Sequence, residues 1–297
     1  FKSDAAYVDS VELLAINDPS ALTAAFQSGQ VNLTSMLDAR TAGLLEQMPN
    51  LRIFNMAGGG YICFNMRCDI EPFNNPDMRM ALKLAVDRED MMQRVVAGIG
   101  TVGNDTPVPS NDAVFAPSVP QLAYDPERAR ALYESVGYTG RIVLHTSDAI
   151  SSRAVDMATV FQEHAARAGI PIDVQRDPSD GYWESVVGHA PFHVAARSAR
   201  PTADAIFSTA FLGTSGNNEC KWVNEEFDAA IIAARAEPDP ERRLAFYERA
   251  QEICSVDGGT IIPFFTGTVQ GTSSDIDGFN VGAVELNGYR AVEQVWF

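Results

Sequence analysis

Residues 73–98 read FNNPDMRMALKLAVDREDMMQRVVAG and contain two helix starts in close succession. Asn75 is a favourable N-cap residue, and Pro76 takes the first helical position, where its missing N–H costs nothing. Asp87 supplies a second cap, and Asp90 lies three residues later, where it can complete a capping box. Apolar residues recur at helical spacing after each start. The stretch therefore predicts two short helices, each with one buried face.

Strands and helices alternate farther along the chain. Apolar segments predict strands at 141–145, 172–175 and 192–196, and the segments between them predict helices at 152–168 and 180–188. This order is typical of a parallel sheet with helices on its faces. Ligands of such sheets bind beyond the carboxyl ends of the strands, which directs attention to the loop that begins at Arg197.

The N-terminal part predicts a smaller unit. Apolar strands at 11–16 and 31–33 flank a helix that begins at Pro19, which together indicate a compact βαβ unit. The glycines at 58–60 predict a turn that separates two strands within 51–66. They do not indicate a phosphate-binding loop, because no helix and no Lys-Ser/Thr pair follows them.

Charge is the outlier in an otherwise ordinary globular composition. The chain has 22 Lys plus Arg against 39 Asp plus Glu, a net charge of −17, and 46% hydrophobic residues. A polyanion would be repelled overall, so we expect no nucleic-acid partner. No apolar run approaches the roughly 20 residues that a helix needs to span a bilayer. The first residues also lack the basic and apolar regions of a signal peptide.

Little in the chain points to catalysis. His145, His164, His189 and His193 are scattered, and Pro191 prevents the last two from sharing a helical face. The chain contains neither the G-x-S-x-G motif of a serine nucleophile nor the H-E-x-x-H motif of a zinc site. We therefore expect no enzymatic activity, no metal and no cofactor.

Four cysteines leave the redox state open. Cys63, Cys68, Cys220 and Cys254 show no spacing that is typical of a metal site. An even count permits disulfides in an oxidising compartment, and four buried thiols are an equal alternative. A bond between Cys63 and Cys68 would need a bend in the extended stretch that contains them.

Several segments along nearly the whole chain resemble the family 5 extracellular solute-binding proteins, which are the peptide-type binding proteins of ABC importers. They are N-P-D-x-R-x-A-L-x-x-A-V-D-R-E at 75–89, YDPERARALYESVGY at 124–138, FDAAIIAARAEPDPERRLAFYERAQEI at 227–253, IIPFF at 261–265 and DIDGF at 275–279. Each segment alone is a weak match, and their common order makes the resemblance specific.

The resemblance implies an α/β fold of the type II periplasmic-binding-protein kind, in which a ligand is enclosed between two lobes joined by hinge strands. Residues 1–66 would form a partial lobe I with the βαβ unit and a hinge strand, 67–263 a complete lobe II, and 264–297 the return to lobe I. Family members are considerably longer. We therefore expect this chain to be a C-terminal fragment that binds ligand weakly alone, with a signal peptide in the missing N-terminal part.

The function that the resemblance implies is capture of a peptide or similar polar solute outside the cytoplasm, in the periplasm, and its delivery to a membrane ABC permease. The protein is expected to be a monomer. Two alternatives stay open: the ligand could be an anionic compound such as an opine or sugar-acid conjugate, or the chain could be the ligand-sensing domain of a regulator.

The loop RSARPTADAIFSTAF at 197–211 carries most of the candidate ligand contacts. In peptide-binding members of the family, an acidic residue shortly after the preceding strand pairs with the peptide's α-amino group, and Ala199 occupies that position here. Asp204 could substitute for it, or could simply stabilise the first turn of a helix. Arg197 and Arg200 flank the gap, and a guanidinium can pair with a carboxylate or phosphate through two hydrogen bonds.

Three further residues complete the predicted site. Ser198 could donate a hydrogen bond, and Asn65 could reach a ligand from the hinge strand. Trp222 could form an apolar wall for a ligand, although the core is the commoner place for a tryptophan. The predicted ligand-binding set is therefore Asn65, Arg197, Ser198, Arg200, Asp204 and Trp222.

Overall fold

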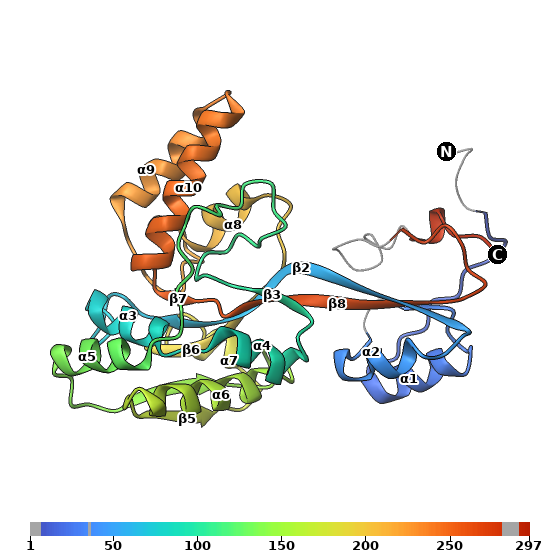
Figure 1. The fold of residues 1–297 in the computed structure, drawn as a ribbon, viewed down its shortest axis with the longest axis horizontal. Helices are drawn as coiled ribbons and strands as arrows, with labels where there is room; N and C mark the ends of the chain where they lie inside the picture. Colours follow the sequence, from blue (N-terminus) through green and yellow to red (C-terminus); the bar gives the residue numbers. More distant parts are fainter. Residues whose placement is uncertain (1–6, 35–36, 281–290) are drawn as a thin grey trace. The chain divides into compact units, whose positions relative to one another are not determined.

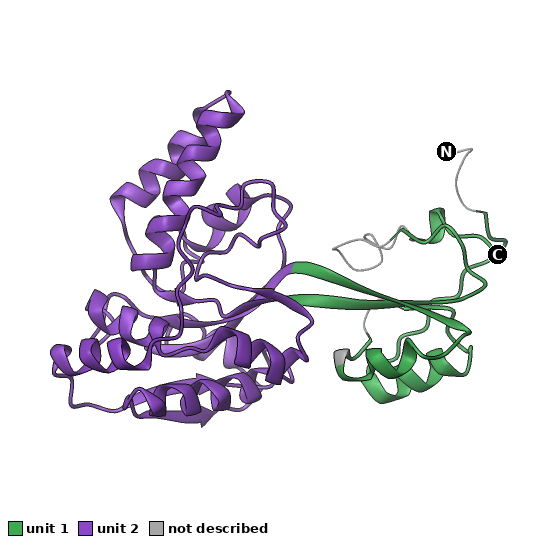
Figure 2. Cartoon of the chain, in the orientation of Figure 1, with its two compact units in different colours: residues 1–58, 266–297 green, residues 59–265 purple. Residues whose placement is uncertain are grey.

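The structure, a computed structural model, describes residues 7–34, 37–280 and 291–297. Its contacts divide the chain into two compact units, 1–58 with 266–297 and 59–265 (Figure 2). The chain passes from one unit to the other within strand β2 (Leu51–Met66) and returns within strand β8 (Phe264–Ser273). The predicted assignment of 1–66 and 264–297 to one lobe, and of 67–263 to the other, stays a prediction.

The larger unit is built on a mixed sheet, and the strand order of the whole sheet is β1-β8-β2-β6-β4-β5 (Figure 1). Strand β4 (Ile142–Thr146) pairs in parallel with both β5 (Ile172–Arg176) and β6 (Phe192–Arg197), which confirms the predicted parallel order. Strand β6 then pairs antiparallel with β2. The carboxyl end of β6 therefore lies beside the middle of β2.

The alternation of side chains along β2 places a separate hydrophobic core on each face of the sheet. Ile62 and Phe64 belong to one core, whereas Tyr61 and Cys63 belong to the other. Helices of the first core are α3 (Pro76–Leu84), α4 (Arg88–Val96), α5 (Pro126–Val136) and α6 (Ala154–Arg167). Helices of the second core are α8 (Ala203–Ala210), α9 (Glu225–Ala236) and α10 (Pro240–Asp257).

The two helices predicted from residues 73–98 are confirmed as α3 and α4. The Asn75 side chain accepts a hydrogen bond from the Asp77 backbone N–H at 2.9 Å, and Asp87 accepts one from Asp90 at 3.0 Å. Each cap thus satisfies a backbone donor that the helix itself leaves unpaired. The buried faces of both helices lie in the first core.

Two predictions about the first 66 residues are wrong. Residues 11–16 form no strand, and Leu13 is 82% exposed, so the predicted βαβ unit does not form. The short strand β1 (Leu33–Thr34) pairs antiparallel with β8 instead. The glycines at 58–60 form no turn, because β2 runs through them without a break. A Cβ at Gly58 would lie 2.3 Å from the carbonyl oxygen of Thr266, so this glycine permits close backbone approach rather than chain reversal.

The remaining elements are short or peripheral. The predicted helix over 180–188 is confined to α7 (Tyr182–Ser185), and the chain from Thr260 forms β7 (Thr260–Ile261) before β8. The other elements are α1 (Pro19–Gln27), α2 (Ala39–Leu45), β3 (Gly100–Val102) and η1 (Ala291–Glu293). The sequence of the C-terminal tail also predicts short strands, and part of this tail, residues 281–290, lies outside the described residues. Among the helices described, none has the length and apolar character needed to cross a membrane.

His193 on β6 is buried in its neutral form. The Gly188 backbone N–H donates to its Nε2 at 3.0 Å, and its Nδ1 donates to the carbonyl oxygen of Ala190 at 3.0 Å. Burial lowers the pKa of this imidazole from the ordinary 6.5 to about 4. The folded state therefore holds fewer protons than the unfolded state between these two values, and acidification favours unfolding.

We expect this histidine to make the protein acid-sensitive. The free energy of unfolding should fall by about 2 kcal/mol between pH 7 and pH 5 through this one group. In His193→Gln the loss over the same pH interval should be smaller by that amount, as measured by urea unfolding at both pH values. His189→Gln, the same substitution at an exposed histidine, is the matched control. An unchanged pH dependence in His193→Gln would contradict the prediction.

Candidate functional site

A buried polar network lies where the carboxyl end of β6 meets β2. Arg197 Nη2 lies 2.7 Å from Glu219 Oε1, and Asn65 Nδ2 donates to Glu219 Oε2 at 2.6 Å. Thr260 Oγ1 in turn donates to Asn65 Oδ1 at 2.9 Å. Four side chains from four different segments are thereby linked in one chain of hydrogen bonds.

This network borders a small pocket that is open to solvent, with about 210 Å³ of space when the adjoining solvent is included. The pocket is lined by Tyr61, Cys63, Asn65, Arg197, Ala210, Phe211, Glu219, Cys220 and Thr260. Three of these residues come from β2 at alternate positions, so their side chains share one face of the sheet. Tyr61 lies directly opposite Arg197 in the β2–β6 register. The strands thus fix the floor of the pocket, and the loop around Glu219 forms its edge.

Burial dominates the electrostatics of the pocket. Desolvation raises the pKa of the Glu219 carboxyl, while Arg197 and the hydrogen bond from Asn65 act in the opposite direction. Burial also raises the pKa of the Tyr61 hydroxyl and of the Cys63 thiol, so both stay protonated. Burial disfavours the charged carboxylate of Glu219, and the Arg197 guanidinium and the Asn65 amide stabilise it. A buried ion pair of this kind contributes little net free energy to folding, because desolvation of the two charges offsets their attraction.

In the described part of the chain, the Arg197 guanidinium bonds to the protein through one of its three nitrogen atoms. Its Nη2 makes both described contacts, one with Glu219 and one with the carbonyl oxygen of Asn217 at 2.9 Å. Within the described ranges, no hydrogen bond of its Nε or Nη1 is found. The Arg197 side chain is 19% exposed and lines the pocket. An oxygen anion is the partner that such donors favour.

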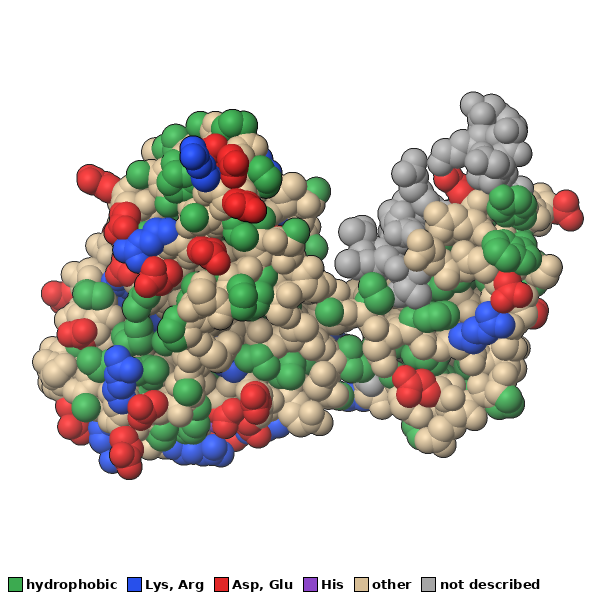
Figure 3. Space-filling model, turned by 45° about the horizontal axis from the view of Figure 1, so that its top comes forward, with side chains coloured by type: hydrophobic (Ala, Val, Ile, Leu, Met, Phe, Trp, Pro, Cys, Tyr) green, Lys and Arg blue, Asp and Glu red, His purple; other side chains and the backbone are tan. Residues whose placement is uncertain are grey.

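A second open pocket, with about 300 Å³ of empty space, lies along the continuation of the same loop. Its lining residues are Gly59, Pro107, Pro109, Asp112, Ser198, Arg200, Thr202, Ala203 and Ile206. Thr202 is the N-cap of α8 and accepts a hydrogen bond from the Ala205 backbone N–H at 3.2 Å. Acidic and basic side chains are interspersed over the face of the larger unit seen in Figure 3, so charge on that face does not itself mark a binding surface.

Four of the six predicted ligand-binding residues thus line these two pockets. Asn65 and Arg197 line the first, and Ser198 and Arg200 line the second. Whether they bind a ligand stays a prediction.

The other two predicted residues lie apart from both pockets. Asp204 accepts a hydrogen bond from Arg235 Nε at 2.8 Å in the first turn of α8. Trp222 is buried in the second core beside Phe227, and its Nε1 donates to Asp257 Oδ2 at 2.9 Å. Both side chains therefore have structural partners outside the two pockets, and their role in ligand binding stays a prediction.

Glu219 was missed by sequence reasoning. It supplies an acidic group to the pocket, although Ala199 occupies the position where the family resemblance placed one. The sequence NNEC at 217–220 carries no periodic pattern that would indicate its register against β2 or β6. Only the fold brings it within reach of Asn65 and Arg197.

The four cysteines are all thiols in this structure, and three of them are buried. In the described part of the chain, no group of three or more His, Cys, Asp or Glu side chains is arranged to hold a metal ion.

The chain is similar to a family of known proteins. The model of the family described as "Bacterial extracellular solute-binding proteins, family 5 Middle" matches residues 1–219. The periplasmic oligopeptide-binding protein OppA of Haemophilus influenzae is 26% identical over 276 residues, which are 87% of this chain and 50% of that protein. The chain spans about half the length of the curated relatives it matches.

Two solved structures show the same fold. The periplasmic binding protein DppA from Helicobacter pylori, in complex with the peptide STSA, has a TM-score of 0.78 and 21% identity and covers 95% of this chain and 55% of its own. The binding protein AgaA of A. tumefaciens R10, in complex with agropinic acid, has a TM-score of 0.81 and 18% identity, covering 100% of this chain and 62% of its own. These likenesses confirm the predicted α/β fold of type II periplasmic binding proteins.

Proposed function

The chain belongs to the family 5 bacterial extracellular solute-binding proteins, and on that basis we propose that it captures a peptide or a similarly small polar solute for an ABC importer. The solute is bound outside the cytoplasm and passed to a membrane permease, and the chain carries out no chemical conversion. A relative that binds oligopeptides and a structural neighbour that holds a peptide support this proposal.

The observation that carries the proposal is the Arg197–Glu219 pair at the carboxyl end of β6. It lies where sheets of this kind bind their ligands, and it offers one cationic and one anionic group to the same pocket. A peptide carries both a carboxylate and an ammonium group, and Nε and Nη1 of Arg197 are suited to the carboxylate. The residues that line both pockets lie within 59–265, in the larger unit.

The second candidate is an anionic solute, such as an opine-like or sugar-acid conjugate. Arg200 favours it, because this exposed cation stands in an acidic chain and lines the second pocket with Ser198. The structural neighbour that holds agropinic acid points the same way. Both candidates share a carboxylate, and they differ in whether an ammonium group must also be recognised.

Mass spectrometry distinguishes the two candidates. The complete protein, with any sequence that precedes Phe1, is purified without denaturation and then denatured, and the released small molecules are identified. We expect one molecule per protein, and a di- or tripeptide supports the first candidate whereas an acidic conjugate supports the second. If no small molecule is released, the stripped protein is incubated with a peptide mixture and with an opine mixture. Failure to bind either mixture would overturn the proposed function.

A further inference from the structure

Cys68 and Cys220 lie side by side next to the pocket. The Cys68 backbone N–H donates to the carbonyl oxygen of Cys220 at 2.7 Å, which joins the segment after β2 to the loop that carries Glu219. Met66, two residues earlier, donates to the carbonyl oxygen of Gly259 at 2.8 Å. The backbones of all three segments therefore meet at one point.

Gly259 leaves the space between the two cysteine side chains open. A Cβ at this position would lie 2.6 Å from Cys68 Sγ and 2.8 Å from Cys220 Cβ, closer than real Cβ atoms approach. Any other residue would therefore push the two cysteines apart. The Cys220 sulfur contacts Thr260 Oγ1 at 3.2 Å, so a bond to Cys68 requires the Cys220 side chain to rotate about its Cα–Cβ bond, away from Thr260.

The other two cysteines have different surroundings. Cys63 Sγ lies 3.7 Å from Asn65 Oδ1 and 3.6 Å from the carbonyl oxygen of Ala195, on the β6 side of β2. Cys254 lies in α10, and its carbonyl oxygen accepts a hydrogen bond from Lys83. Neither is joined to a second cysteine by the kind of backbone contact that connects Cys68 with Cys220.

We propose that Cys68 and Cys220 form a disulfide bond when the protein folds in the oxidising compartment where members of its family act. The two thiols lose two protons and two electrons, and the S–S bond forms between their sulfurs. The oxidant is a disulfide reagent, which accepts both electrons by thiol–disulfide exchange and is released as two thiols.

The burial of the two thiols determines when the bond forms. Burial raises the pKa of Cys68 to about 11 and also raises the pKa of Cys220 well above its ordinary value, so few thiolates exist in the folded protein at neutral pH. Oxidation therefore occurs while the chain is folding, before Gly259 and β2 enclose the pair. The bond is a fixed part of the structure rather than a reversible switch.

The bond has a consequence for the pocket, which rests on the proposed function. Residue 220 adjoins Glu219 and residue 68 follows β2, so the bond ties the edge of the pocket to its floor. Reduction would leave the fold in place and let the Glu219 loop move. We expect the reduced protein to bind its solute several-fold more weakly than the oxidised protein. If the pocket is not the ligand site, the oxidised and reduced proteins should bind the solute equally well, even though the disulfide bond is present.

The bond itself is tested without any ligand. The complete protein is isolated without reductant from an oxidising host compartment, denatured, and alkylated, and its peptides are mapped under non-reducing conditions. We expect one linked pair of peptides containing Cys68 and Cys220, and two alkylated thiols at Cys63 and Cys254. Four alkylated thiols, or a link from Cys220 to Cys63 or Cys254, would overturn the proposal.

Two serine variants separate this pairing from a general loss of thiols. Cys68→Ser should leave three alkylated cysteines and no linked peptides, whereas the matched control Cys254→Ser should keep the link and leave one alkylated cysteine. If Cys68→Ser does not accumulate as folded protein, the peptide map of the wild type decides alone. A linked pair that survives in Cys68→Ser would contradict the pairing.

Discussion

Replacing Asp105 with asparagine should lower the free energy of unfolding by about 3–5 kcal/mol, because two buried cations depend on its charge. Asp105 is fully buried, with its Oδ2 at 2.7 Å from Arg88 Nη2 and 4.0 Å from Lys83 Nζ. Its Oδ1 accepts a hydrogen bond from the Ile262 backbone N–H at 2.9 Å. The Asp105 carboxylate thus lies close to one cation from α3 and one from α4, and it also binds the segment that leads into β8.

Removing the charge leaves Lys83 and Arg88 buried without an anion. Lys83 keeps its hydrogen bonds to the carbonyl oxygens of Cys254 and Ser255, at 3.1 and 2.8 Å, and these do not neutralise a cation. Burial lowers the pKa of Lys83 and Asp105 acts against that shift, so the lysine of the variant loses its proton more readily. Deprotonation limits the loss of stability without cancelling it.

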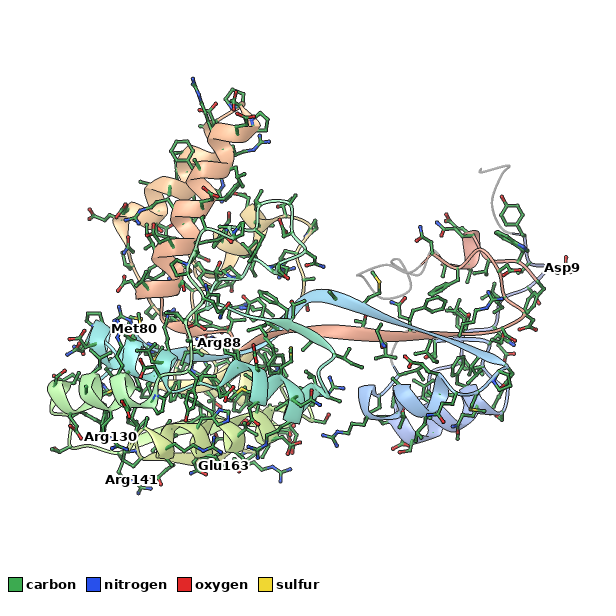
Figure 4. The ribbon with its side chains drawn as sticks, in the orientation of Figure 1. Asp9, Met80, Arg88, Arg130, Arg141 and Glu163 are labelled. Atoms are coloured by element: carbon green, nitrogen blue, oxygen red, sulfur yellow. The ribbon has the colours of Figure 1, made fainter. Side chains whose placement is uncertain are left out.

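Urea unfolding of Asp105→Asn measures this loss, and Asp173→Asn is the matched control. Asp173 pairs with Arg141 at 2.6 Å, with side chains that are 53% and 78% exposed, so its loss should cost less than about 1 kcal/mol. Figure 4 shows the contrast, with Arg88 inside the larger unit and Arg141 at its outer edge. Equal losses in the two variants would show that the buried cluster contributes no more than a surface pair.

Local chemistry explains which parts of the fold could be predicted from the sequence. The helix starts at Asn75 and Asp87 were predictable because a cap bonds to a backbone donor only a few residues away. The three parallel strands were predictable because each is a short apolar run between helical patterns. The strand expected at 11–16 failed because apolar composition does not reveal whether a partner strand is present, and Leu13 is exposed.

Features that could not be predicted from the sequence depend on contacts between residues that are far apart in the chain. The glycines at 58–60 resemble a turn in isolation, and only the approach of the Thr266 carbonyl explains why Gly58 lies in a continuous strand. Arg197 could be singled out because it follows a parallel strand. Glu219 could not, because its position depends on where an irregular loop meets β2 and β6. Asp204 and Trp222 were chosen from the sequence without knowledge of their partners Arg235 and Asp257.

Arg197→Ala should weaken solute binding by roughly ten- to a hundredfold, which is the effect of losing about 1.5–3 kcal/mol from a charged hydrogen bond. The substitution removes a guanidinium that lines the pocket, and it also leaves Glu219 buried without its cation. Burial already raises the pKa of Glu219, so the carboxyl group can take up a proton once Arg197 is removed, and Asn65 still contacts it, so the pocket should keep its shape. The loss should therefore appear in affinity, with a smaller effect on folding.

The matched control for this variant is Arg235→Ala. Arg235 pairs with Asp204 at 2.8 Å, has a 41% exposed side chain, and lies outside both pockets. Its removal should leave the affinity unchanged within about twofold. A large effect of Arg235→Ala would instead return Asp204 to the ligand site.

Calorimetric titration of the complete protein with the solute recovered by mass spectrometry measures whether Arg197 contributes to ligand binding. The wild type, Arg197→Ala and Arg235→Ala are compared at one pH, after urea unfolding has shown that all three are folded. We predict that binding is roughly ten- to a hundredfold weaker in Arg197→Ala and is retained in Arg235→Ala. Binding by Arg197→Ala as tight as that of the wild type would contradict a ligand site at the carboxyl end of β6.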